Sequence, residues 1–500
     1  MAGGSESKSS NKMCDLLKCV LSSVLLGLSA YAIILGVSLN YCSLFDEEMS
    51  IGKWETVINA SILTFVCILL FINEGFQVAL LSAQPLNIET DFKQFPRAAK
   101  CHELLFPVKN GIKDSNMKRL FIGQSFLVVL STFLMAKITH FRKFDAFWAF
   151  NSEWFAAYLG SVFQGIFFTI CVLQLFPSII GKNYPREFLN LPLVFSTIKL
   201  ALLIESLGIV QFTYLLVYSA ERAVFKEPSK SSMNNAMMEI QDKKEEGFYF
   251  YLSLFKYTCS TILTIAALAF LLFCISSNYS SFAGPVALQF VLLLVAMILI
   301  FYCEGLKVAI VSNQQNFAHQ TQNLLATPLT DESESVKLAK DGFVLISESS
   351  ILRLLGSTDN GIERYLLGRQ QTVVPLGFLI ASITHFGYYP IGILSPTVDF
   401  LLTGFGLPVV IILLQFSQLT PQLLAEKFGS MFLKLPGSMQ MVQLALFIEL
   451  FGITSVVSYF VELIKTWKAP PTAPPTTKEE DEIELSALKT TISNPLRHTW

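Results

Sequence analysis

Long runs of apolar residues, separated by mostly short polar connections, cover most of the chain. Residues 191–218 and 288–311 are two clear examples. Runs of about 20 apolar residues are typical of helices that cross a membrane. The pattern predicts ten such helices, which start near Leu16, Thr56, Arg119, Trp154, Leu193, Phe250, Val286, Tyr365, Thr397 and Met439.

The composition supports a membrane protein. Of the 500 residues, 52% are hydrophobic and only 15% are charged, whereas soluble domains carry about 25% charged residues. So few charges cannot cover a water-facing surface of this size, which excludes a soluble enzyme, a nucleic-acid-binding protein and a disordered chain. The formal net charge of −2 creates no overall field toward an acidic or basic partner.

Residues that commonly ligate metals show no metal-binding pattern. Most of the nine cysteines lie inside the apolar runs, and the sequence contains neither a CxxC pair nor an HExxH motif. We therefore expect free thiols, no metal site and no cofactor. The first apolar run, residues 16–40, is too long for the core of a signal peptide, so we expect it to be the first membrane helix.

The two halves of the chain carry the same motifs in the same order, which indicates an internal repeat. The motif Glu-Gly-x-x-Val-Ala occurs at 74–79 and 304–309, and Ile-Thr-His-Phe occurs at 138–141 and 383–386. Further repeat-related pairs are Arg119 and Arg364, Gln174 and Gln418, Pro192 and Pro436, and Gly208 and Gly452. Matches this dense are too many to arise by chance.

Each half holds five predicted helices. An odd number makes the second half enter the membrane from the opposite side, which gives the inverted repeats of many secondary transporters. We predict an all-α polytopic membrane protein of about ten transmembrane helices in two inverted five-helix repeats. The repeats comprise residues 1–245, with a cytoplasmic N-terminal segment, and 246–467. Residues 468–500 form a Pro-rich, acidic tail that we expect to be disordered.

Basic residues predict the orientation. The connection 84–118 holds six lysines and arginines, and connections with this bias remain in the cytoplasm. Both termini are then cytoplasmic. The sequon at Asn278 falls in a connection on the same side, where it escapes glycosylation. We expect the plasma membrane, with an intracellular vesicle membrane as the alternative.

Four carboxylates lie within predicted membrane helices, as the repeat-related pairs Glu74 with Glu304 and Glu205 with Glu449. A carboxylate at mid-membrane costs about 2.5–3.5 kcal/mol on insertion scales, and such groups are functional by default. We interpret Glu74 and Glu304 as substrate-binding residues. Glu205 and Glu449 are candidates for ion coupling, with structural pairing between helices as an equal alternative.

Polar residues lie close to Glu74 and Glu304 on the same helices. Gln77 lies one turn after Glu74 on the same helix face, and Lys307 has the same relation to Glu304. Gly75 and Gly305 permit close helix contact or local unwinding. Two such helices facing each other would place four polar side chains around one cavity.

A second repeated motif lies near the start of the third and eighth helices, as Gly123-Gln124-Ser125 and Gly368-Arg369-Gln370. The glycines free backbone groups, and Gln124, Arg369 and Gln370 supply donors for an oxygen-rich ligand. An equal alternative for Arg369 is that it extends to the membrane surface.

Other repeated polar residues favour structural roles. We expect Gln174 and Gln418 to form hydrogen bonds between helices. His140 and His385 lie at helix ends, where a solvated histidine is the simpler interpretation than a proton relay.

The paired Glu-Gly-x-Gln and Gly-Arg-Gln motifs resemble those of the silicon transporters first known from diatoms, and of their silicon-transporter-like relatives. The resemblance covers about residues 16–464. It implies sodium-coupled uptake of silicic acid. Residues 74–77 and 368–370 match the family pattern as they stand, but Lys307 replaces a glutamine and Gln124 replaces an arginine. Our hypothesis is that Lys307 neutralises Glu304 and mimics a bound cation, which weakens one sodium requirement.

The sequence leaves three classes of function to compare. The first is a secondary transporter of silicic acid or a similar small oxyacid such as boric acid. The second is an exchanger of sodium, calcium or protons built on inverted five-helix repeats. The third, an intramembrane enzyme or a scaffold, lacks the paired Asp, His cluster or Ser/His arrangement that catalysis needs, and a scaffold has no use for repeated buried glutamates. The expected partners are silicic acid and the lipid bilayer but no nucleic acid, and homo-oligomer formation stays open.

Overall fold

The computed structural model describes residues 4–39, 54–82, 94–109, 112–113, 116–140, 163–224, 247–280, 282, 284–312, 351, 354–355, 361–386, 400–452, 454–457 and 459–460. These residues are helical, apart from turns and one hairpin of two-residue strands, β1 (Val108–Lys109) and β2 (Ile112–Lys113). Helices dominate because lipid offers no partners to the backbone, so each segment must satisfy its own polar groups. The all-α polytopic prediction is confirmed.

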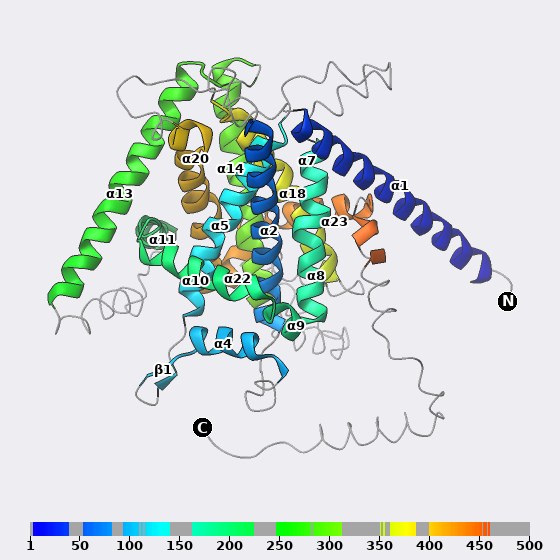
Figure 1. Ribbon diagram of the computed structural model, residues 1–500, viewed down its shortest axis with the longest axis horizontal. Coiled ribbons are helices and arrows are strands. Elements are labelled where there is room, and N and C mark those ends of the chain that lie inside the picture. The colour runs from blue at the N-terminus through cyan, green and yellow to red at the C-terminus, as the bar shows by residue number, and fades with distance from the viewer. Residues whose placement is uncertain are drawn as a thin grey trace, which may run out of the picture. The chain divides into compact units, whose positions relative to one another are not determined.

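Among the described residues, eight helical segments are long and apolar enough to cross a membrane (Figure 1). In the first half they are α1 (Gly4–Ser38), α2 (Glu55–Ser82), α5 (Met117–Ile138) and the run α7 (Phe163–Phe168), η3 (Thr169–Leu175) and α8 (Phe176–Asn183). In the second half they are α13 (Gly247–Ser276), α14 (Val286–Ser312), α18 (Gly361–Ile383) and the run α20 (Leu407–Ile412), η6 (Leu413–Leu419) and α21 (Thr420–Lys427).

The fourth segment of each half contains a π-helical stretch, η3 and η6, at repeat-related positions. A π-helix widens the turn, and such insertions are frequent at functional sites. The fourth helix was predicted to start near Trp154, which lies outside the described residues. In the second half, π-helix η5 (Phe400–Gly404) precedes α20, and Gly406 between them has a left-handed φ of 62°.

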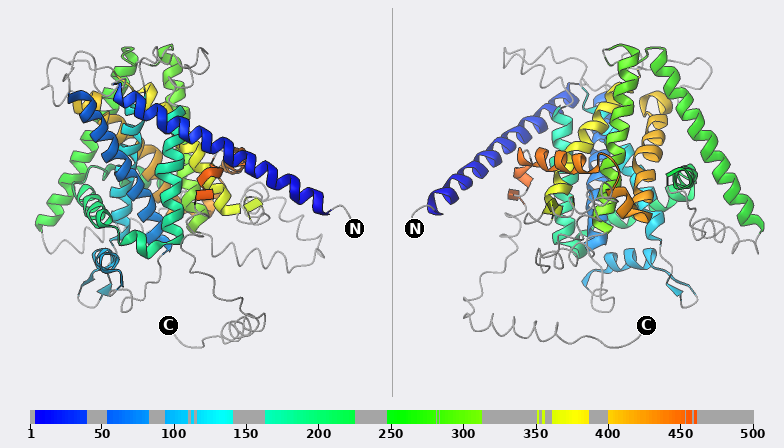
Figure 2. Two further views of the ribbon diagram at one scale, coloured as in Figure 1. Left: turned by 45° about the vertical axis from the view of Figure 1, so that its right-hand side comes forward. Right: turned by 180° about the vertical axis from the view of Figure 1, so that it is seen from behind.

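The fifth predicted helix of each half is not one continuous crossing. In the first half it is broken into α10 (Pro192–Ser206) and α11 (Phe212–Val224), and in the second half α23 (Ser438–Leu450) ends early. The break follows a glycine with a left-handed backbone, Gly208 at φ 77° and Gly452 at φ 63°. Figure 1 shows α11 end-on, and Figure 2 shows α23 lying across the long helices. Within the described ranges the structure therefore has eight candidate crossings rather than the predicted ten.

In the part of the chain that the structure describes, each half contains four candidate crossings, and the two repeats run in the same direction. His140 and His385 follow the repeat-related helices α5 and α18, and their ring centroids lie 5.6 Å apart. Inverted repeats would place these two positions on opposite sides of the membrane. The prediction of inverted repeats is therefore wrong, because the repeat-related helices α5 and α18 end on the same side. The structure also buries His385 to 4% exposure, so the expectation of a solvated side chain is wrong there.

The first helix of each repeat packs on the broken segment of the other repeat. The backbone N–H of Phe212 donates to Ser260 Oγ of α13 at 3.0 Å. The backbone N–H of Val456 donates to Ser22 Oγ of α1 at 2.9 Å. These two bonds join repeat-related positions, so the repeats interlock through reciprocal contacts. Met1–Val457 accordingly form one compact unit.

Short helices lie at the same end of the bundle as the start of α5. They are α4 (Pro96–Leu105), α9 (Pro185–Leu189) and α22 (Gly429–Leu433) (Figure 1). Proline occupies the first turn of α4 and α9. Proline has no backbone N–H, but in the first turn this N–H would have no acceptor within the helix, so nothing is lost there. The predicted repeat boundary at 245–246 and the tail 468–500 lie outside the described residues.

Candidate functional site

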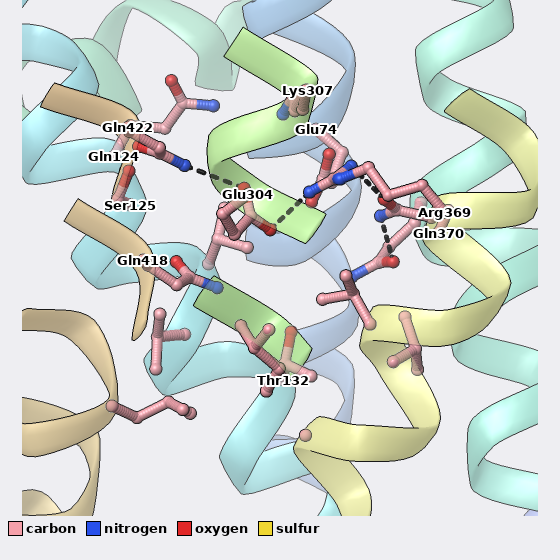
Figure 3. A pocket seen from close by; sticks show the side chains of 18 of the residues that line it. Glu74, Gln124, Ser125, Thr132, Glu304, Lys307, Arg369, Gln370, Gln418 and Gln422 are labelled. Atoms are coloured by element: carbon pink, nitrogen blue, oxygen red, sulfur yellow. Dashed lines mark hydrogen bonds and ion pairs between the residues drawn. The ribbon is translucent and has the colours of Figure 1, made fainter. Parts of the chain in front are cut away.

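A polar pocket lies between the two repeats, with walls from α2, η3 and α5 of the first and α14, α18, η6 and α21 of the second. Its volume is about 60 Å³, and on the same measure one water needs about 10–15 Å³. The pocket therefore has room for a few waters or one small polyol. Polar residues in its lining are Glu74, Gln77, Gln124, Ser125, Thr132, Gln174, Glu304, Lys307, Arg369, Gln370, Gln418 and Gln422 (Figure 3).

The second-repeat wall is a connected network around Glu304. Arg369 forms a buried ion pair with Glu304 Oε1, and Gln422 Nε2 donates to Glu304 Oε2 at 2.9 Å. Arg369 also donates from Nε to the carbonyl of Cys303 at 3.2 Å and from a terminal nitrogen to Gln370 Oε1 at 2.9 Å. Both carboxylate oxygens and the guanidinium of this wall are therefore already bonded within the protein.

Gln370 continues this network to the first repeat, where its amide donates to Gln174 Oε1 of η3. The alternative in which Arg369 extends to the membrane surface is wrong, because Arg369 is only 5% exposed and points into the pocket. The prediction of hydrogen bonding between helices holds for Gln174. Gln418 lines the pocket.

The first-repeat wall is more open. Gln124 Nε2 donates to the carbonyl of Asn73 at 2.7 Å, which is the repeat equivalent of the bond from Arg369 to Cys303. Gln124 Oε1 has no hydrogen-bond partner among the described residues although Gln124 is 2% exposed. Glu74, 8% exposed, likewise has no hydrogen bond or ion pair among them. Glu74 is therefore the unbonded carboxylate in the lining of this wall, whereas Gln124 Oε1 is covered by protein atoms.

The charges in the pocket are balanced between the repeats. Glu74 brings one negative charge, and its neighbours Gln77 and Gln124 are neutral. In the second repeat, Lys307 and Arg369 outnumber Glu304 by one positive charge. The charges of Lys307 and Arg369 act on both glutamates. The pocket as a whole is therefore neutral when all four groups are ionised.

The motif glycines serve close packing. A β-carbon on Gly123 would lie 1.8 Å from the carbonyl oxygen of Ala201, and one on Gly368 equally close to Ala445. A β-carbon on Gly75 or Gly305 would overlap the ring of Phe188 or Phe432. All four glycines lie inside regular helix. Close helix contact is thus what they provide, and the alternative of local unwinding is wrong.

Glu205 and Glu449 lie away from the pocket. Arg119 Nε donates to Glu205 Oε2 at 2.8 Å, and Arg364 donates to Glu449 at 2.6 and 2.9 Å. The arginines belong to the first turns of α5 and α18. Neither glutamate is among the residues that line the cavity. Their arrangement matches the structural alternative, and their role in ion coupling stays a prediction.

The structure thus brings together all seven predicted substrate-binding residues: Glu74, Gln77, Gln124, Glu304, Lys307, Arg369 and Gln370. Sequence reasoning missed Gln422, which bonds Glu304. Its signal was present, because it lies one turn after Gln418 and so shares that helix face. Ser125 also had a signal, because it occupies the repeat position of Gln370 in the second motif. Thr132 lacked one, since isolated hydroxyls are common in membrane helices.

In the part of the chain that the structure describes, eight apolar helices around a buried, charged pocket between two repeats indicate an integral membrane protein. Residues 9–231, which contain nearly all of the described part of the first repeat, match the family model described as silicon transporter. The match confirms the resemblance seen in the motifs. It supports a transporter of silicic acid in general, and it points away from an enzyme. No curated protein and no solved structure matches the chain.

Proposed function

We propose that this protein is a sodium-coupled secondary transporter that moves silicic acid by alternating access. The observation that carries the proposal is the neutral pocket at the repeat interface, lined by the Glu-Gly motifs of both halves, in a chain whose first half matches silicon transporters. Parallel repeats, like inverted ones, can rock against each other around a fixed central site.

Silicic acid suits the chemistry of this pocket. It is a small, neutral, tetrahedral polyol, so each hydroxyl both donates and accepts hydrogen bonds. The Glu74 carboxylate is an available acceptor, and Lys307 and the Gln77 amide are donors. A neutral ligand leaves the charge balance of the cavity intact, whereas an anionic substrate would disturb it at low dielectric.

Sodium coupling is part of the proposal. The Glu74 carboxylate is the most accessible acidic ligand for sodium, because Arg369 and Gln422 already bond both oxygens of Glu304. The alternative of a cation exchanger is weaker for the same reason. An exchanger needs carboxylates free to bind successive cations, and two fixed cations, Lys307 and Arg369, stand in this pocket.

We also propose that the face with the start of α5 is cytoplasmic, because the basic connection 84–118 precedes α5. Both termini would lie on this side, and the plasma membrane is the proposed location.

Uptake into proteoliposomes tests the function. We expect silicic acid to accumulate with an inward sodium gradient, and to accumulate at least about tenfold less with potassium in its place or in Glu74→Gln, because a buried polar group would lose its partner. Lys199→Gln, on the surface of α10, is the matched control and should transport normally. Boric acid and calcium are the comparison solutes. Calcium flux without silicic acid flux would contradict the proposal and favour the exchanger.

A further inference from the structure

The two walls of the pocket carry different charges at repeat-related positions. Arg369 of the second repeat occupies the position of Gln124 in the first, and both donate to the carbonyl of the residue before the motif glutamate. Arg369 then pairs with its own glutamate, Glu304. Gln124 cannot do this for Glu74, so the first repeat lacks the cation that neutralises the glutamate in the second.

The missing cation is present on the opposite wall. Lys307 occupies the repeat position of Gln77, so the second repeat carries one cation more than its own glutamate requires. Among the charges that act on Glu74, that of Lys307 is the strongest attraction. Arg369 repels Lys307, and Glu304 attracts it more strongly than Glu74 does, but Arg369 and Gln422 already bond both oxygens of Glu304. Glu74 and Lys307 both line the pocket, and Figure 3 shows both side chains there.

We propose that Lys307 is the counter-ion of Glu74 across the repeat interface, and that this pair selects a neutral oxyacid by keeping the pocket uncharged. This inference deepens the proposed function and rests on it for the substrate. It differs from the expectation that Lys307 serves Glu304, whose oxygens are bonded by Arg369 and Gln422.

The two walls of the pocket therefore have different roles. The Glu304 network is closed within the protein and holds α14, α18 and α21 together. Glu74 and Lys307 form no direct ion pair among the described residues, so a hydroxyl group can bridge them. Glu74 and Lys307 are therefore specificity-determining residues, whereas Arg369 is a positioning residue for Glu304.

Moving the cation tests the proposal. Lys307→Gln removes the counter-ion, and Gln124→Arg adds a cation at the position that Arg369 has in the other repeat. We expect each single variant to lower silicic acid uptake at least about tenfold, because an unpaired buried charge remains. The double variant Lys307→Gln/Gln124→Arg restores the balance, and uptake should return to within about threefold of the parent. Lys307→Gln/Gln77→Lys, which returns the cation one turn from Glu74, should also recover.

Thermal unfolding of the same purified variants provides a readout independent of the substrate. The single variants should unfold at lower temperature than the parent, and the double variants should recover. Double variants no better than Lys307→Gln in both measurements would overturn the counter-ion role, even with normal silicic acid uptake by the parent. If the parent takes up no silicic acid, the proposed function fails, and recovery of unfolding temperature still decides the pairing. Lys199→Gln remains the control in both assays.

Discussion

At the residue scale, the most informative positions are those where a charge or a glycine is hard to explain in a membrane helix. Glu74 and Glu304 carry an insertion cost of about 2.5–3.5 kcal/mol, and the structure directs both into one pocket. The glycines of the motifs are explained by contact, because carbonyl oxygens or phenyl rings fill the place of their β-carbons.

The glycine contacts predict strong destabilisation by alanine. Gly123→Ala and Gly368→Ala place a methyl group against a backbone carbonyl of α10 or α23, which cannot move as a side chain can. We expect each to lower the free energy of unfolding by about 3 kcal/mol or more. Thermal unfolding in detergent measures this. Gly27→Ala on α1, with no atom within 4 Å of the new β-carbon, should change stability by less than about 1 kcal/mol.

Cys101 of α4 should be chemically inert in the folded protein. Burial raises the pKa of its thiol to about 12, compared with about 8.5 in an unfolded chain. The folded state therefore keeps its proton, and the stability that this provides is full below about pH 8.5 and is lost as pH rises toward 12. Alkylation at pH 8.5, followed by mass spectrometry, should modify Cys101 only after unfolding. Equal rates in folded and unfolded protein would contradict this.

At the element scale, one glycine in each repeat decides whether a helix crosses the membrane. The apolar run at 191–218 is long enough to cross, yet the chain turns after α10 because Gly208 adopts a left-handed φ. Apolar length cannot reveal such a turn, since the same composition suits a crossing helix and a helix lying across its neighbours. The repeated Glu-x-x-Gly at 205–208 and 449–452 was the available signal.

Alanine at these turns should weaken the packing between the repeats. Gly208→Ala and Gly452→Ala impose a left-handed conformation that costs an L-residue about 1–2 kcal/mol. Their new methyl groups also approach Lys256 of α13 and Lys18 of α1 within 2.9 Å. We expect lower unfolding temperatures for both variants. Gly284→Ala, whose nearest contact is an ordinary 3.5 Å, is the control, and an equal loss there would contradict the turn as the cause.

At the scale of the whole molecule, parallel repeats place different connections on the same side of the membrane than inverted repeats would. Asn116, at the start of α5, donates to Leu104 of α4 at 3.1 Å. Ser280 donates to the carbonyl of Ile383 at the end of α18, beside the end of α5. The 22 residues of α5, at 1.5 Å each, span the membrane core. The expectation that Asn278 lies on the side of the basic connection is therefore wrong.

Labelling from one side checks this arrangement. Lys100→Cys on α4 and Asn278→Cys, both at exposed positions, should react with a membrane-impermeant maleimide from opposite sides of sealed vesicles. The parent protein measures the background from its native cysteines. Reaction of both introduced cysteines from the same side would restore the inverted arrangement.

The sequence by itself determined the helical class, the duplication and the polar residues of the pocket, because hydrophobicity, repetition and insertion cost are properties of residues and their spacing. The tertiary structure decided the direction of the second repeat, the partners of each charge and the difference between the two walls. The backbone turn at Gly208, which precedes the second repeat, affects that direction because it breaks the fifth predicted helix of the first repeat. The charge partners depend on which helices pack together, because Glu304 meets Arg369 and Gln422 only where α14, α18 and α21 converge.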